Sequence, residues 1–174
     1  SVPGAATTNL TRRLLSDQRV QAVGLGARDS LRLEAGLCLY GHELTTEIDP
    51  VQAGLMWSIS QSRRAEGERA GGFPGADVIF RRMIDKPALR RVGLHVDGKR
   101  PVREGPVVLD ESGRQVGEIC SACYGASVGG PIAMAYIERE LGLPGTKLLV
   151  VSRDKHLPVT VTPMPFNPQR YFRG

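Results

Sequence analysis

The first half of the chain has apolar residues at helical spacing in two separate segments. Residues 5–17 place apolar side chains on one face and turn Arg12 and Arg13 outward, which predicts a short amphipathic helix. Residues 76–84 repeat this pattern until Lys86-Pro87, where proline lacks the amide proton that a helix needs. Both predicted helices need an apolar surface against which to pack.

Local composition predicts two further helices. Residues 30–35 are good helix formers, and Gly36 is a typical C-terminal stop. Asp49-Pro50 fits a cap followed by proline in the first turn, which predicts a brief helix before Trp57. Only residues 20–23 and 37–40 look extended in this half. We therefore interpret the helix-bearing piece as part of a larger domain.

From Arg90 onward the pattern changes to short apolar or alternating runs, separated by turn residues such as Asp97-Gly98. Six such runs predict strands, over residues 92–96, 107–109, 116–120, 132–137, 147–151 and 159–162. Consecutive short strands indicate a small antiparallel barrel or sandwich. The sequence thus predicts an α+β fold divided near residue 88, with the helix-bearing piece first and a β domain second.

The composition is that of an ordinary globular protein. The 174 residues are 41% hydrophobic and 24% charged, enough for one substantial core or two small ones. No run approaches the roughly 20 apolar residues that a membrane helix requires, so we expect a soluble protein and no membrane partner. The net charge of +5 comes from scattered arginines, and aromatic residues make up only 5%. We therefore expect no nucleic-acid partner.

The chain has three cysteines, an odd number, which favours reduced thiols in a cytosol or an organelle matrix. Cys120 and Cys123 have the spacing of a metal or redox site. A structural zinc site needs four ligands, however, and the sequence has no second close pair of Cys or His. We interpret the two thiols as an incidental pair and expect no metal.

Residues 125–129 match the G-x-S-x-G pattern of a nucleophile elbow, which needs a sharp turn from a strand into a helix. Pro131 follows at once and the next run predicts a strand, so a glycine-rich turn between strands is favoured. The carboxylates of Glu34, Glu43, Glu47 and Asp49 are expected at the solvated surface, since nothing in the sequence makes them converge.

The longest distinctive stretch covers residues 24–41 and reads Gly-Leu-Gly-Ala-Arg-Asp-Ser-Leu-Arg-Leu-Glu-Ala-Gly-Leu-Cys-Leu-Tyr-Gly. Arg28 stands where a glycine-bounded loop meets a helix, so a rigid element would direct its donors toward a carboxylate or heterocycle. Trp57 offers a flat apolar face for a ring. A structural ion pair for Arg28 and core packing for Trp57 are the alternatives on these residues alone.

This stretch closely resembles the signature of the T-protein aminomethyltransferases of the glycine cleavage system. Shorter matches support it, at Thr45-Thr46, Phe73-Pro74-Gly75, Gly145-Thr146 and Met164-Pro165-Phe166. The resemblance covers essentially the whole chain. It implies that residues 1–87 are the C-terminal part of the folate-binding domain and that residues 88–174 are the C-terminal β-barrel domain.

The resemblance implies a reaction in which the methylene group of an aminomethyl unit on the lipoyl arm of H-protein passes to tetrahydrofolate, with release of ammonia. It implies lipoylated H-protein as partner and tetrahydrofolate as acceptor, without a metal. The protein would work in the cytoplasm of a bacterium or in the mitochondrial matrix of a eukaryote.

The resemblance implies that three residues contribute to the folate site. Arg28 matches the family's folate-site arginine, Tyr171 a terminal-tail aromatic, and Trp57 is a further pocket candidate. The family's catalytic aspartate and its pterin-gripping glutamate motif lie in its N-terminal half. We therefore expect no catalytic residue among residues 1–174 and no activity of this fragment alone.

Two alternatives remain beside the stand-alone transferase. The same architecture forms the folate-binding C-terminal region of dimethylglycine and sarcosine dehydrogenases, although the unbroken match over residues 28–41 favours the transferase. A non-catalytic module that docks an acidic protein partner through its basic surface is the second alternative.

Overall fold

The computed structural model describes residues 1–103, 105–152, 155–172 and 174. Three α-helices precede the β domain: α1 (Gly4–Leu15), α2 (Leu25–Glu34) and α3 (Ala76–Asp85). Short 3₁₀ turns lie between α2 and α3, at Met56–Ser58 and Gln61–Arg63, and between β4 and β5, at Arg139–Leu141. Six strands form the C-terminal part: β1 (Leu89–Val96), β2 (Val107–Leu109), β3 (Gln115–Gly125), β4 (Gly130–Glu138), β5 (Lys147–Ser152) and β6 (Lys155–Thr162).

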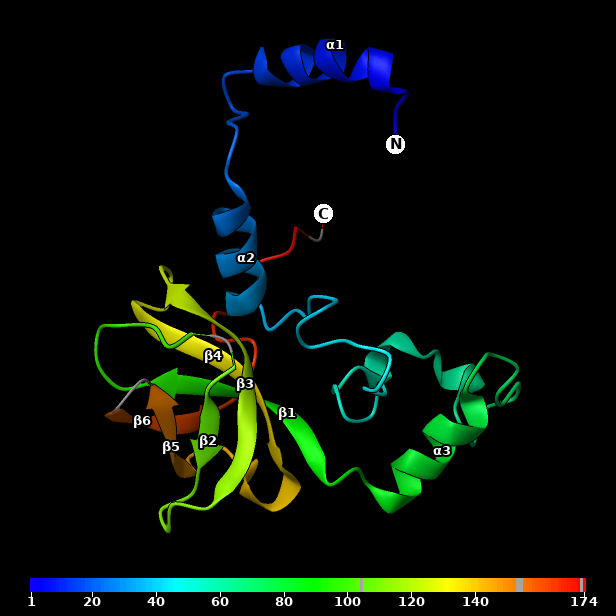
Figure 1. Ribbon diagram of the computed structural model, residues 1–174. Coiled ribbons are helices and arrows are strands. Elements are labelled where there is room, and N and C mark those ends of the chain that lie inside the picture. The colour runs from blue at the N-terminus through cyan, green and yellow to red at the C-terminus, as the bar shows by residue number, and fades with distance from the viewer. Residues whose placement is uncertain (104, 153–154, 173) are drawn as a thin grey trace.

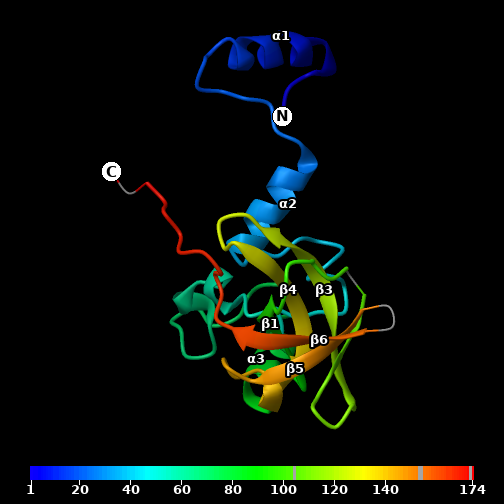
Figure 2. The same ribbon diagram turned by 90° about the vertical axis from the view of Figure 1, so that its left-hand side faces the viewer.

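The strands close into an antiparallel barrel in the order β1-β4-β3-β2-β5-β6, and β6 pairs back onto β1 (Figures 1 and 2). This confirms the predicted α+β fold and decides for a barrel over a sandwich. Each predicted strand is present within a few residues of its expected bounds. The first strand begins at Leu89, next to the division proposed near residue 88.

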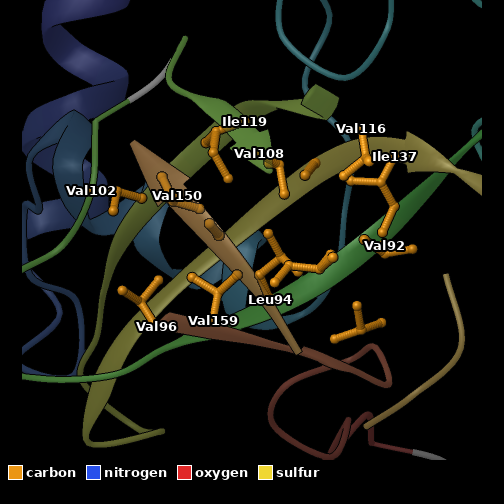
Figure 3. Packing of buried hydrophobic residues seen from close by; sticks show 14 residues of the cluster. Val92, Leu94, Val96, Val102, Val108, Val116, Ile119, Ile137, Val150 and Val159 are labelled. Atoms are coloured by element: carbon orange, nitrogen blue, oxygen red, sulfur yellow. The ribbon is translucent and has the colours of Figure 1, made fainter. Parts of the chain in front are cut away.

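The barrel interior is filled by small and medium apolar side chains, which Figure 3 shows converging from all sides. Residues such as Leu94, Val108 and Val150 are fully buried there. Burial of each of these side chains contributes about 2 kcal/mol to stability. The barrel therefore has its own hydrophobic core.

β4 is buried on both faces, which explains why its sequence is almost continuously apolar. Ala133, Ala135 and Ile137 point into the barrel core. Ile132 and Met134 belong to a second cluster on the outer side, together with Leu33 of α2. Strands covered on both faces lose the usual alternation of apolar and polar residues. α2 accordingly sits against the outside of β3 and β4 (Figures 1 and 2).

The predicted helix ends are confirmed for α2 and α3. The Gly36 amide donates to the carbonyl of Leu33 at 2.9 Å and the Leu37 amide to that of Arg32 at 2.8 Å, a Schellman motif. Gly36 takes φ 68°, which glycine adopts without a steric penalty. α3 ends at Asp85, immediately before Lys86-Pro87.

The brief α-helix predicted after Asp49-Pro50 is wrong. The chain makes a hydrogen-bonded turn there, in which the Ala53 amide donates to the Asp49 carbonyl at 3.0 Å. Gly54, with φ 70°, stops the turn before a helix can propagate. Residues 1–87, all of which the structure describes, hold no strand beyond an isolated bridge between Tyr40 and Leu44.

α1 has no buried residue and stands apart from the barrel (Figure 1). Its apolar residues Leu10, Leu14 and Leu15 are 40–53% exposed. No helix among the described residues combines the length and apolar character needed to cross a membrane.

Candidate functional site

The distinctive stretch of residues 24–41 forms α2 and the loop that follows it. Arg28 lies in the first half of α2 and is exposed, and its side chain makes no hydrogen bond or ion pair within the described part of the chain. The structural ion pair considered for Arg28 is therefore not formed here. Its guanidinium remains available to a ligand while its backbone belongs to a helix.

Arg32, one helical turn further along, is almost completely paired. Its Nε donates to Asp29 Oδ1 at 2.8 Å, its Nη1 to Glu43 Oε2 at 2.7 Å, and its Nη2 to Ser121 Oγ at 2.8 Å. Arg32 is 8% exposed and Glu43 is fully buried. A buried arginine is stable only when its donors are satisfied in this way.

The expectation that the carboxylates of Glu34 and Glu43 are solvated is wrong. Glu43 Oε2 accepts hydrogen bonds from Arg32 and from the Leu39 amide, and Tyr136 Oη donates to the Glu43 carbonyl at 2.8 Å. Glu34 Oε1 accepts from the Ser127 amide at 2.9 Å. Glu47, by contrast, is exposed as expected. Asp49 is half-buried, and it accepts from the Gln52 amide at 2.8 Å and pairs with Arg82 at 3.4 Å.

Glu34 also connects α2 to the C-terminal tail. Its carbonyl accepts from the amides of Phe166 and Asn167 at 2.9 and 3.2 Å. The tail continues from there to Tyr171, which is 59% exposed. The last turn of α2 thus fixes the start of the segment that carries Tyr171.

Trp57 is 72% exposed and lies on the 3₁₀ turn after the 37–55 loop. Its ring is therefore not packed in a core formed by the described residues. Its ring lines an open groove of about 390 Å³ between this loop, the barrel and the tail, with Arg90, Arg91, Met164 and Gln169 among the other lining residues. Arg28 and Tyr171 do not line this groove, so the three predicted folate residues do not share one cavity in the described part of the chain.

Arg91 of β1 lines this groove and connects the segments around it by hydrogen bonds. Its Nε donates to the carbonyl of Ala53 and its Nη1 to that of Gly36, both at 2.9 Å. The loop around Ala53 and the end of α2 are therefore attached to the barrel by one side chain. The sequence carries no signal for this role of Arg91, because both acceptors are backbone carbonyls.

A second groove, of about 580 Å³, lies on the outer wall of the barrel. Its lining includes His42, Glu118, Cys120 and Tyr136. No group of three or more His, Cys, Asp or Glu residues suited to a metal ion occurs among the described residues.

The three cysteines are free thiols, and their surroundings disfavour the thiolate form. Burial is the main cause that raises the pKa of Cys120 far above its usual range and that of Cys123 to about 11. Burial also raises the pKa of Cys38. Redox-active cysteines have the opposite shift, toward the thiolate. This agrees with an incidental pair on β3.

The G-x-S-x-G stretch is the turn that connects β3 to β4, as predicted. The Gly129 amide donates to the Gly125 carbonyl at 2.8 Å, and no helix follows, because β4 begins at Gly130. Its Ser127 contributes a backbone amide to Glu34 rather than a nucleophile.

Residues 90–167 match the family described as the glycine cleavage T-protein C-terminal barrel domain, and residues 2–63 match the GCVT N-terminal domain. Relatives include the mitochondrial aminomethyltransferases of Flaveria anomala, 46% identical over 99% of this chain and 42% of the relative, and of Gallus gallus, 44% identical over 99% and 43%. The chain thus spans less than half the length of the curated relatives it matches.

A solved structure shows the same fold. The crystal structure of the glycine cleavage system aminomethyltransferase T from Bartonella henselae superimposes with a TM-score of 0.92 at 37% identity, covering 99% of this chain and 46% of that one. Both family matches, the relatives and this structure agree over nearly the whole chain. The chain belongs to the glycine cleavage T-protein family.

Proposed function

We propose that residues 1–174 form the C-terminal portion of a tetrahydrofolate-dependent aminomethyltransferase of the glycine cleavage system. The whole protein would pass the methylene group of aminomethyl-dihydrolipoyl H-protein to tetrahydrofolate, and ammonia and the dihydrolipoyl thiol would be released. The observation that carries this proposal is the 46% identity over 99% of the chain to a protein named aminomethyltransferase. Relatives from plants, chicken and dog are named mitochondrial, so in a eukaryote the matrix is the proposed location.

Within this function, residues 1–87 would be the C-terminal part of the folate-binding domain and residues 88–174 the barrel domain. Arg28 is the proposed folate ligand, with Tyr171 and Trp57 as further contacts. The free guanidinium of Arg28 supports this role, since the neighbouring Arg32 has its donors occupied while Arg28 has none engaged within the described chain. The exposed ring of Trp57 supports a stacking role for a flat heterocycle.

For this reaction, residues 1–174 need to orient the folate acceptor more than to supply an acid or a base. A thioaminal must lose ammonia while an iminium-like carbon meets a folate nitrogen, so the position of the acceptor controls the rate. The catalytic aspartate of the family is expected upstream of the residues described here. This portion would hold one wall of the folate site.

The proposal is tested with the full-length protein by calorimetric titration with tetrahydrofolate and by assay of methylenetetrahydrofolate with loaded H-protein. Arg28→Ala is expected to raise the Kd for tetrahydrofolate about tenfold or more, because it removes a charged hydrogen-bond donor. Arg81→Ala, an exposed arginine of α3, is the matched control and is expected to leave the Kd unchanged. Wild-type protein that neither binds folate nor turns over would favour the non-catalytic module instead.

A further inference from the structure

The buried residues of α2 all lie in its last turn. They are Arg32, Leu33 and Glu34. Leu33 packs against Ile132 and Met134 in the outer cluster. This apolar contact holds the turn on the barrel but does not fix the orientation of the helix. The first half of α2 has no buried residue. Contacts of the last turn therefore set the direction of the N-terminal half of α2.

Arg32 supplies two of the directional contacts of this turn, beside the hydrogen bonds that Glu34 accepts from Ser127 and from the C-terminal tail. Its planar guanidinium binds Glu43 on the loop after α2 and Ser121 on β3, and Ser121 is 3% exposed. The two acceptors are reached by different nitrogen atoms of the same rigid fork, so the side chain fits in one orientation. Ser121 lies where the pairing of β3 with β4 shifts register, a bulge that re-aims side chains from a strand.

Arg28 and Arg32 are four residues apart on one helix and therefore share a face. Four residues correspond to about 6 Å along the axis, so a tilt at Arg32 displaces the Arg28 guanidinium. Asp29, between them, accepts from Arg32 Nε and is half-exposed. The barrel thus reaches the candidate ligand residue through a continuous chain of contacts that passes through Arg32.

We propose that Arg32, held by Ser121 and Glu43, is a positioning residue for folate binding, through which the barrel fixes the direction of Arg28. This inference rests on the proposed function and assigns to the barrel domain a specific task in it. Neither Ser121 nor Glu43 touches the ligand in this scheme. Both act through Arg32 and then through the backbone of α2.

The first test is Ser121→Ala in the full-length protein, with the Kd for tetrahydrofolate measured by calorimetry. The Kd is expected to rise about tenfold, since small displacements of a binding group are costly. Ser152→Ala is the matched control, because Ser152 lies on β5 and makes no hydrogen bond to α2. It is expected to leave the Kd unchanged.

A second variant covers the case in which Ser121→Ala disturbs folding. Glu43→Gln keeps the size of the side chain and removes its charge, and it is also expected to raise the Kd. Glu47→Gln is its control on the same loop, since Glu47 is exposed. Thermal unfolding of each variant establishes that the protein is folded when the Kd is measured.

A double-mutant cycle separates positioning from general structural damage. If Ser121 acts through Arg28, Ser121→Ala has no further effect on the Kd in an Arg28→Ala background. Two outcomes overturn the positioning role, provided that Arg28→Ala still weakens folate binding. One is that Ser121→Ala raises the Kd equally in the wild-type and Arg28→Ala backgrounds. The other is that neither Ser121→Ala nor Glu43→Gln changes the Kd. An unchanged Kd for Arg28→Ala instead overturns the proposed folate site itself.

Discussion

The guanidinium of Arg32 and the carboxylate of Glu43 lie 2.7 Å apart and form an ion pair in which Glu43 is fully buried. Burying two charges is costly, and mutual attraction with further hydrogen bonds offsets the cost. The Leu39 amide and the Ser121 hydroxyl provide those bonds. The pair therefore depends on both partners being present.

Removing one partner tests this dependence. Glu43→Ala leaves Arg32 buried with only Asp29 as an anionic partner, and we expect the free energy of unfolding to fall by about 3 kcal/mol. Urea unfolding of the chain, followed by circular dichroism, measures the change. Glu47→Ala is the control and is expected to change it by less than about 0.5 kcal/mol. Equal losses in the two variants would contradict a structural ion pair.

Gly117 lies where β3 passes close to the backbone of β4. A Cβ atom at this position would lie 2.2 Å from the backbone carbonyl oxygen of Tyr136, which a side-chain rotation does not relieve. Gly117→Ala is expected to destabilise the chain by about 3 kcal/mol. Gly26→Ala is the opposite case, since nothing lies within 4 Å of its Cβ and it sits in α2. It is expected to stabilise by up to about 1 kcal/mol, measured by the same unfolding experiment.

Arg91 links three segments, and its loss should loosen two of them. Arg91→Ala leaves the carbonyls of Gly36 and Ala53 without their donor, which we expect to cost about 2–3 kcal/mol of stability. Limited proteolysis should then cleave faster within residues 37–63. Arg91→Lys is expected not to restore resistance, because one ammonium does not replace the guanidinium fork. Wild-type cleavage rates in Arg91→Ala would refute the linkage, and Arg12→Ala on the exposed α1 is the control.

The raised pKa of Cys123 predicts a pH-dependent reactivity. At pH 9 about half of an ordinary thiol is ionised, whereas about 1% of a thiol with a pKa of about 11 is ionised. Because the thiolate is the form that is alkylated, alkylation of Cys123 should be about fiftyfold slower in the folded chain than in urea. The folded pKa lies above the unfolded value of 9.0, so the stability linked to this thiol is present below pH 9 and is lost between pH 9 and about 11. Mass spectrometry of the labelled peptide gives the rate. Equal rates with and without urea would show that Cys123 is not protected.

Residues 1–174 alone are expected to show no formation of methylenetetrahydrofolate and only very weak folate binding. The chain covers 42% of the Flaveria anomala relative, and the family's catalytic aspartate is expected outside it. An assay with loaded H-protein and tetrahydrofolate, with the full-length protein as positive control, measures this. Turnover by the purified chain would contradict the assignment of the catalytic group to another part of the protein.

Local pattern was enough to predict most of the secondary structure. Helical spacing located α1 and α3, and alternation with turn residues located the six strands. These signals are local, since a helix or strand is specified by side chains a few residues apart. The turn after Asp49 was mispredicted because a cap and a proline begin a helix that Gly54 then stops.

The candidate site was less predictable. Arg28 could be named from its place in a recognisable stretch of sequence. The burial of Glu43 and the roles of Ser121 and Arg91 could not, because a carboxylate or a serine has no local signal for a partner that is distant in sequence. Arg32 and Ser121 are 89 residues apart and meet only after the barrel has formed.

Local sequence pattern predicted the positions of α1, α3 and the six strands, and the stretch of residues 24–41 indicated the family. The tertiary structure decided that the strands close in the order β1-β4-β3-β2-β5-β6, that α2 covers β3 and β4, and that Arg32 is paired while Arg28 is free. The physical reason is the range of the interactions. Backbone propensity and side-chain periodicity act over a few residues, whereas strand order and buried charge pairing depend on segments brought together by folding.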